Sequence, residues 1–183
     1  MVTKYTKYCY NSASHRFFGA VLEGDIKRFK QLVSLENINM RNDWCGQTPL
    51  LATAYLDDIV MAVLLLEKKA DIELENQFGM DVFMIAAYYG YLSYLKQMLS
   101  KEKYKHMWNN TCSSGKTALM YAVMNKSEGN VAVVKLLLEK GFDPSTTDNE
   151  GQTAAQIASE NGFQNMVDLL MVAEKRRTGR KFI

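Results

Sequence analysis

The chain has few residues that interrupt or cross-link a fold. Its 183 residues include 2 prolines and 3 cysteines, and no stretch is of low complexity or typical of a flexible linker. Runs of about 18 apolar residues, the length that a membrane-spanning helix needs, are absent, so the sequence predicts no membrane span. With 48% hydrophobic and 23% charged residues, the composition is typical of one folded domain.

Cysteine and histidine are too few and too scattered for a metal site. The thiols are Cys9, Cys45 and Cys112, without a C-x-x-C pair, and the imidazoles are His15 and His106. An odd number of widely spaced cysteines indicates neither a disulfide framework nor zinc. We therefore expect reduced thiols, no metal and no cofactor.

The expected location follows from the thiols and from the first residues of the chain. Reduced thiols favour the cytoplasm. The opening "MVTKYTKYCYNSASHRFF" has no continuous apolar stretch followed by a small-residue cleavage site, so we expect no secretory signal here. A periplasmic or secreted location stays open if a signal peptide has been removed from this chain.

The chain carries little net charge, but its basic residues gather at one end. The formal net charge is +2, too small to steer the whole protein toward nucleic acid, which argues against a nucleic-acid partner. Residues 174–183, "EKRRTGRKFI", hold five basic side chains against one acidic. We interpret this basic C-terminal tail as a solubilising terminus, and contact with phosphate or an acidic partner is the alternative.

One segment of the sequence is repeated. The stretch "GQTPLLATAYLDDIVMAVLLLEKKADIE" begins at Gly46, and edited copies begin at Gly79, Gly115 and Gly151. These glycines are 33, 36 and 36 residues apart. A fixed period of about 20 to 50 residues is typical of stacked supersecondary units.

Each copy predicts a helix, a turn and a second helix. Thr48 suits the N-cap, and Pro49 suits the first helical position because it lacks an N–H that would have no partner there. Thr117, Thr153 and Asp81 can repeat the cap. Small residues recur in each first helix and leucines in each second helix, so neighbouring units can stack closely and bury a shared core.

Several motifs at these positions resemble the ankyrin repeat family. They are "GQTPLLATA", "LLLEKKADIE", "GKTALMYAV", "NVAVVKLLLEKGFDP" and "GQTAAQIASENGF". The resemblance covers about residues 13–173 and implies an all-α repeat solenoid, an ankyrin-type stack of about five helix-turn-helix units joined by short β-hairpin loops. The expected units are about 13–42, 43–75, 76–109, 110–147 and 148–173, with an N-terminal extension over 1–12 and the basic tail over 174–183.

The sequence departs from the family pattern in three ways. The family's histidine is replaced by Leu51, Met84, Met120 and Gln156, so its polar network at the hairpin base is expected to be absent. The third unit has a long segment before Gly115, which predicts an irregular loop. The fourth unit inserts about three residues at "NKSEGN" between its helices.

No arrangement of residues predicts catalysis. Cys112 and His106 are the nearest nucleophile and base, and both fall in the irregular loop. Asp57 and Asp58 occupy an inter-helix turn, which turn chemistry explains. The "GKT" at Gly115 lacks the upstream glycine of a phosphate loop. We therefore expect a protein that is not an enzyme and has no catalytic residues.

The resemblance implies that hairpin tips and exposed positions of the first helices contact a partner. In the clear units these positions hold many large aromatic and apolar side chains, and such a patch is unusual on a monomer. Self-packing is the alternative, for example of Leu56 beneath the next hairpin or of Met80 against Phe78. The predicted partner-binding residues are Trp44, Gln47, Tyr55, Leu56, Phe78, Met80, Tyr88, Tyr89, Lys116, Met124 and Asn125.

The sequence thus favours a non-catalytic module that binds one folded protein through a concave aromatic face and is monomeric on its own. An inhibitor or immunity protein that blocks a partner enzyme is one alternative. Binding of nucleic acid or an anionic surface through the basic tail is another. The residues do not distinguish a scaffold from an inhibitor.

Overall fold

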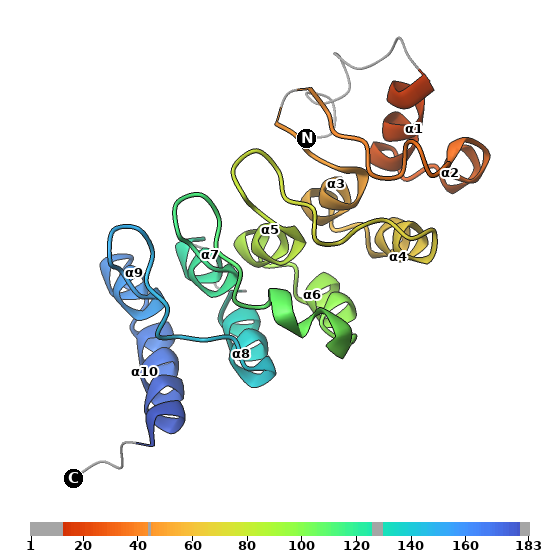
Figure 1. The fold of residues 1–183 in the computed structure, drawn as a ribbon. Helices are drawn as coiled ribbons and strands as arrows, with labels where there is room; N and C mark the ends of the chain where they lie inside the picture. Colours follow the sequence, from red (N-terminus) through yellow and green to blue (C-terminus); the bar gives the residue numbers. More distant parts are fainter. Residues whose placement is uncertain (1–12, 44, 126–129, 180–183) are drawn as a thin grey trace. The chain divides into compact units, whose positions relative to one another are not determined.

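The computed structural model describes residues 13–43, 45–125 and 130–179. Within these ranges the chain forms ten α-helices and one 3-10 helix, η3, and its only strand-like pairing is an isolated bridge between Thr147 and Thr153 (Figure 1). The chain divides into an N-terminal part, residues 1–77, and a C-terminal part, residues 78–183. The predicted extension over 1–12 lies outside the described residues.

The N-terminal part contains two helix pairs. They are α1 (Ala13–Leu22) with α2 (Ile26–Leu32), and α3 (Pro49–Leu56) with α4 (Ile59–Glu67). The helices of each pair pack together, and α1 also packs against α3. Asp25 and Asp58 cap the second helices by accepting hydrogen bonds from the backbone N–H groups of Arg28 and Met61.

The C-terminal part contains three helix pairs and the 3-10 helix. They are α5 (Val82–Tyr89) with α6 (Leu92–Met98), η3 (Glu102–Met107), α7 (Ala118–Met124) with α8 (Asn130–Lys140), and α9 (Ala154–Glu160) with α10 (Gln164–Thr178). The first helices pack in the order α5, α7, α9. The second helices follow the same order, with α8 contacting both α6 and α10. Paired layers of this kind within each part are an all-α repeat arrangement, as the sequence predicts.

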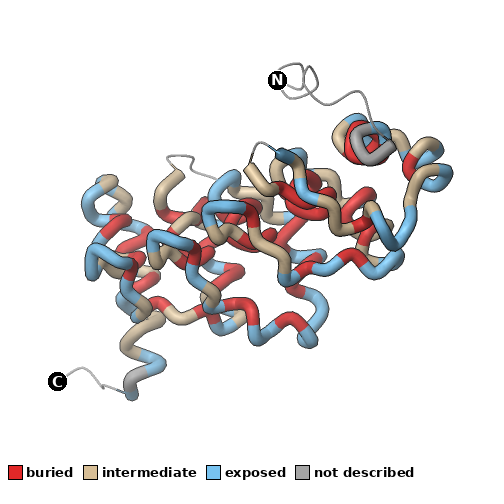
Figure 2. The backbone as a smooth tube through the Cα atoms, turned by 45° about the horizontal axis from the view of Figure 1, so that its top comes forward, coloured by how far each residue is buried: buried red, intermediate tan, exposed pale blue. Residues whose placement is uncertain are grey.

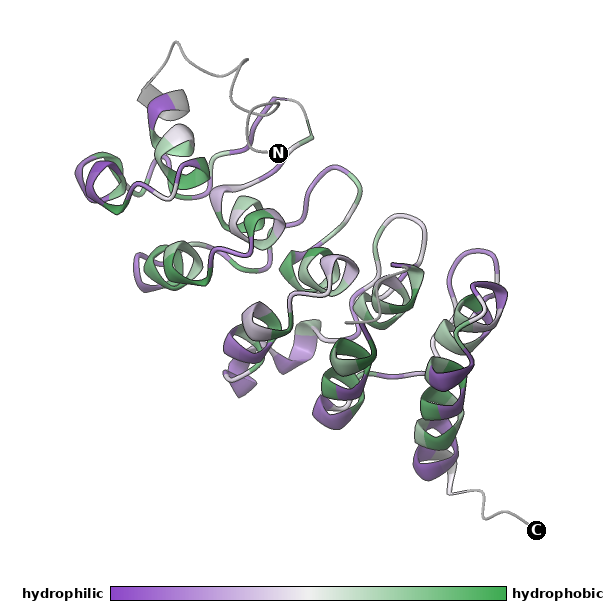
Figure 3. Cartoon of the chain, turned by 180° about the vertical axis from the view of Figure 1, so that it is seen from behind, coloured by the Kyte–Doolittle hydropathy of each residue, from purple (hydrophilic) through white to green (hydrophobic). Residues whose placement is uncertain are grey.

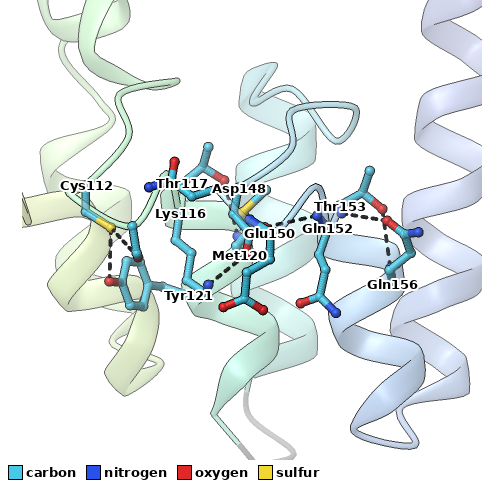
Figure 4. Close-up of polar contacts among 12 residues, drawn as sticks. Cys112, Lys116, Thr117, Met120, Tyr121, Asp148, Glu150, Gln152, Thr153 and Gln156 are labelled. Atoms are coloured by element: carbon cyan, nitrogen blue, oxygen red, sulfur yellow. Dashed lines mark hydrogen bonds and ion pairs between the residues drawn. The ribbon is translucent and has the colours of Figure 1, made fainter.

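The predicted caps of the first helices are confirmed. The side chains of Thr48, Asp81, Thr117 and Thr153 each accept a hydrogen bond from the backbone N–H three residues later. In the last repeat Gln156 stands where the family has a histidine. There the Gln156 side chain accepts from the Thr153 N–H at 2.8 Å, which completes a capping box (Figure 4).

The core lies along the facing sides of the helices (Figure 2). The first helices contribute fully buried alanines as well as large side chains such as Leu50 and Phe83, and the second helices contribute mainly large ones. Small side chains allow helix axes to approach closely, and the larger side chains fill the space on the other side. The zero-exposure alanines of the first helices are Ala20, Ala52, Ala54, Ala86, Ala87, Ala122 and Ala158, and buried leucines of the second helices include Leu65, Leu95, Leu137 and Leu170.

Successive hairpin tips are joined by backbone hydrogen bonds. In each case the carbonyl just before a recurring glycine accepts from an N–H of the next tip. The pairs are Cys45 with Gln77 at 3.0 Å, Phe78 with Ser113 at 3.0 Å, and Ser114 with Asn149 at 3.1 Å. Two side-chain bonds of similar span support the tips: Asn39 accepts from the Asp71 N–H, and Asn109 accepts from the Asp143 N–H. The tips therefore stack at a backbone distance that leaves little room.

The recurring glycine is required at these contacts for two reasons. Gly115 has φ 77°, and a Cβ there would lie 2.7 Å from the Asn149 nitrogen. Gly151 also has φ 77°, but a Cβ there would meet nothing within 4 Å. Both positions need a left-handed backbone, whereas only Gly115 also lies against a following tip.

The segment after α6 is irregular, as the sequence predicts. It forms η3, and Trp108 directly after it stacks on Phe142 with ring centroids 5.6 Å apart. Tyr104 and Met107 are buried beside it. The longer connection thus adds aromatic and apolar surface to the core instead of extending into solvent.

One buried side chain links the end of α7 to the start of α8. Asn130, the first residue of α8, has no exposed area. Its Nδ2 donates to the Ala122 carbonyl at 2.7 Å and to the Asn125 carbonyl at 3.5 Å. Asn130 therefore ties the start of α8 to the end of α7 across residues 126–129, which lie outside the described ranges.

The last helix continues into the predicted tail. It runs to Thr178, and Gly179 ends it with a left-handed backbone. Arg177, in its last turn, forms an ion pair with Asp143. Figure 3 shows hydrophilic residues at this end of α10. Residues 174–178 are thus helical, and residues 180–183 lie outside the described part of the chain.

Gly115 and Gly151 make a matched pair for a stability test. A left-handed alanine costs about 1 to 2 kcal/mol, which is the loss in unfolding free energy expected for Gly151→Ala. Gly115→Ala should lose at least about 1 kcal/mol more, because its methyl group also overlaps a neighbouring backbone. Urea unfolding measures both losses. Equal losses would show that contact between the tips does not constrain position 115.

Candidate partner-binding surface

Four tyrosines of the C-terminal part form one connected group, here called the tyrosine cluster. Tyr88 and Tyr89, at the end of α5, pack edge to face with centroids 5.2 Å apart. Tyr89 stacks on Tyr91 at 5.5 Å and 14°. Tyr88 also meets Tyr121 of α7 edge to face at 6.2 Å. The ring contacts hold each side chain in one orientation.

The cluster is partly exposed. Tyr88 and Tyr89 keep 38% and 40% of their accessible area, and Phe78 in the preceding hairpin keeps 55%. Tyr91 and Tyr121 are half-buried. Sequence reasoning selected Tyr88 and Tyr89 but missed the other two. No helical spacing signals either one, since Tyr91 follows Gly90, which ends α5, and Tyr121 lies on α7, 33 residues after Tyr88.

The other predicted residues of the C-terminal part differ in burial and in contacts. Asn125, just after α7, donates a side-chain hydrogen bond to the Tyr88 carbonyl and so ties the ends of α5 and α7 together. Met80 and Met124 are half-buried. The Asn125 hydrogen bond therefore supports the cluster through its backbone, while Tyr88 and Tyr89 stay partly exposed.

The predicted residues of the N-terminal part have mixed positions. Tyr55 is half-buried and its hydroxyl lies 3.4 Å from the Asn76 amide nitrogen, while Leu56 is exposed. Gln47 is only 7% exposed, so the expectation of an exposed contact residue is corrected there. Its side-chain oxygen lies 3.4 Å from the Asn42 amide nitrogen, inside the hairpin. Trp44 lies outside the described residues.

Lys116 is held in an ion pair. Its Nζ lies 2.7 Å from Asp148 Oδ2, and the Asp148 side chain has no exposed area (Figure 4). The hydrogen bond from Lys116, with bonds from the backbone N–H groups of Gln152 and Glu150, holds the pKa of Asp148 below its usual value. The same hydrogen bond raises the pKa of Lys116. Lys116 therefore joins two hairpins within the protein, whether or not it also contacts a partner.

Cys112 and His106 do not form a nucleophile and base pair. Cys112 is buried, and its sulfur lies 3.1 Å from Ser114 Oγ and 3.3 Å from the Tyr121 hydroxyl. Burial raises the pKa of the thiol, but these hydrogen bonds outweigh burial and leave the pKa below its usual value. His106 is exposed, with Nδ1 3.1 Å from the Lys103 carbonyl oxygen. The thiol therefore bonds to hydroxyl groups that have no general-base chemistry at neutral pH.

The described ranges contain neither a candidate metal cluster nor a membrane-spanning helix. There, no three His, Cys, Asp or Glu side chains come together in a group that could hold a metal ion. In the same ranges, every helix is too short or too polar to cross a bilayer. The prominent features of the described surface are thus aromatic, namely the tyrosine cluster and, in the preceding hairpin, Phe78.

Helix pairs joined by stacked glycine-containing hairpins define an all-α repeat solenoid. The family model for ankyrin repeats (3 copies) matches three overlapping stretches, residues 17–107, 52–148 and 83–178. The chain therefore belongs to the ankyrin repeat family. Ankyrin repeats generally mediate protein–protein interaction, and the members of the family are typically non-catalytic.

Individual proteins share parts of this sequence. YahD of Escherichia coli (strain K12), named as an ankyrin repeat protein, is 32% identical over 139 residues, which cover 75% of this chain and 68% of YahD. The DNA replication inhibitor plutonium of Drosophila melanogaster is 32% identical over 114 residues, 62% of each chain. The human NAD-capped RNA hydrolase NUDT12 is 42% identical over 66 residues, only 14% of its own length.

The buried ion pair makes stability depend on pH. Because the folded-state pKa of Asp148 is lowered, its stabilising contribution is present above its usual pKa, about 4, and is lost as the pH falls further. Asp148→Asn should therefore flatten the acid side of the stability profile. Thermal melts between about pH 2.5 and 6 test this, with Glu139→Gln on α8 as the control. An unchanged acid slope in Asp148→Asn would assign acid unfolding to other carboxylates.

Proposed function

We propose that this protein is a non-catalytic module that binds one folded protein through the tyrosine cluster and Phe78. The observation that carries the proposal is the partial exposure of Tyr88 and Tyr89, together with the ring contacts that fix them. In this proposal the binding domain spans residues 13–173, and the protein acts as a monomer.

Tyrosine suits such a role for energetic reasons. A tyrosine offers a large amphipathic contact area with only two rotatable side-chain bonds, and tyrosines are enriched among the residues that dominate binding energy. Stacked rings have already lost much of their rotational freedom, so binding costs less additional entropy.

The test begins with capture of partners by the wild-type protein and by a Tyr88→Ala, Tyr89→Ala bait. For a partner that only the wild type retains, calorimetry should show that each single alanine variant loses about 2 kcal/mol or more, roughly thirtyfold in affinity. Val60→Ala on α4 removes another exposed apolar side chain, 59% exposed, and should bind normally. Thermal melts of the variants should remain close to the wild type, since both tyrosines are partly exposed.

Two outcomes would contradict this proposal. Normal binding by both folded alanine variants would remove the tyrosine cluster from the interface. Loss of binding on deletion of residues 174–183, with the tyrosines dispensable, would instead favour an acidic or phosphate-bearing partner at the basic tail. Arg177 already pairs with Asp143, which is why the tail is not the leading candidate.

A narrower second candidate is an inhibitor that blocks an active partner. The similarity to a relative whose name describes a DNA replication inhibitor is the observation that favours it. Once a partner is known, its activity should fall when the wild-type protein is added, whereas Tyr89→Ala should leave the activity high. Binding without any change in partner activity would favour a scaffold.

A further inference from the structure

We infer that the partner presents arginine side chains to the tyrosine cluster and to two carboxylates of the last repeat. This inference rests on the proposed function and adds the chemistry of the partner. It follows from the charges of the surface formed by the hairpins and first helices of the C-terminal part, here called the first-helix surface. Its described residues are 78–91, 109–125 and 143–161.

The first-helix surface has an excess of negative charge. Among its described residues Lys116 is the single lysine or arginine, and Asp148 pairs with it. Five residues are acidic, namely Asp81, Asp143, Asp148, Glu150 and Glu160. Asp81 is buried as the cap of α5, and Asp143 pairs with Arg177. The carboxylates of Glu150 and Glu160 are exposed and form neither of these two ion pairs, although the charge of Glu150 helps to raise the pKa of Lys116.

The two exposed carboxylates lie on the repeat next to α7. Glu150 is in the last hairpin, and Glu160 ends α9. Glu160 occupies the same place after its recurring glycine as Tyr88 and Met124, so these three residues form one row across α5, α7 and α9. The Gln152 amide lies 2.6 Å from Glu160 Oε1, which orients the carboxylate. One end of the surface is therefore aromatic and the other acidic.

Arginine matches both ends of this row. Its flat guanidinium stacks on tyrosine ring faces, which carry partial negative charge, and it binds carboxylates through two parallel hydrogen bonds. An acidic partner would meet Glu150 and Glu160 with repulsion. A wholly apolar partner would bury their charges without compensation, which is costly. A compact lysine ammonium would lack the planar contact with the rings.

The other side of the C-terminal part has a different character. Exposed lysines there include Lys96 on α6, Lys135 on α8 and the Lys101, Lys103 and Lys105 group around η3. Lys103 and Lys105 already contact the rings of Tyr104 and Trp108. A basic partner would therefore be attracted to the first-helix surface and repelled by the η3 region, which gives the interaction a defined side.

Peptide probes test the inference without a known partner. The probe is a capped hexapeptide of alternating glycine and arginine, with otherwise identical peptides that carry citrulline, lysine or glutamate. Citrulline has nearly the shape of arginine without its charge. In two-dimensional NMR titrations the arginine peptide should shift the amide signals of Tyr88–Tyr91 and of Glu160. The citrulline peptide should bind at least about fivefold more weakly. This corresponds to the loss of about 1 kcal/mol expected for a cation–π contact.

Matched protein variants locate the binding. Tyr89→Leu should weaken the arginine peptide while keeping apolar area, and the double variant Glu150→Gln, Glu160→Gln should weaken it and reduce its salt dependence. Glu139→Gln, an exposed acid on α8, should change neither. Circular dichroism confirms that each variant is folded.

The outcomes separate this inference from the proposed function. Equal binding of the arginine and citrulline peptides, or stronger binding of the glutamate peptide, would overturn the arginine inference. Arginine binding unaffected in Tyr89→Leu and in the double glutamine variant would place the contact elsewhere and also overturn it. If a captured partner needs Tyr88 and Tyr89 but tolerates the double glutamine variant, the proposed function stands. The inference that the partner presents arginines to the carboxylates is then contradicted.

Discussion

The backbone hydrogen bond between successive hairpin tips is the contact on which the arrangement of each part depends. It fixes the separation of neighbouring repeats at the tip, and the fully buried alanines of the first helices allow those helices to approach closely. The helix contacts and the hydrogen bonds between tips must therefore form at the same distance between neighbouring repeats. The tyrosine cluster exists because this spacing brings Tyr88 of α5 within ring contact of Tyr121 of α7.

Much of the architecture could be predicted from the sequence because its determinants are local. A cap such as Thr48 bonds to the backbone three residues later, and the left-handed glycine is a property of one residue. Both therefore recur visibly with the period. The capping box of Gln156 escaped prediction because glutamine was judged only by its departure from the family's histidine, although its spacing from Thr153 is that of the box.

The surface was less predictable because it depends on contacts between distant residues. Lys116 and Asp148 are 32 residues apart, and no local pattern pairs them. Gln47 was expected at the surface, but Asn42 bonds to both its side chain and its backbone and holds it within the hairpin. The roles of Tyr121 and Tyr91 emerge only when neighbouring rings are placed. Aromatic content indicated a binding surface, while the membership of the cluster required the structure.

Asn130 affects how much the connection between α7 and α8 can vary in length and sequence. Its two hydrogen bonds join α8 to the end of α7 by a route that does not pass through residues 126–129. The helices are therefore held in place independently of the segment that connects them in the chain. Since doubling the length of a flexible loop costs only about 0.6 kcal/mol, longer or differently composed connections could be accepted here while the helix pair stays intact. The position next to the tyrosine-bearing helices is thus one where new sequence could accumulate, and with it new partner specificity, without reorganising the core.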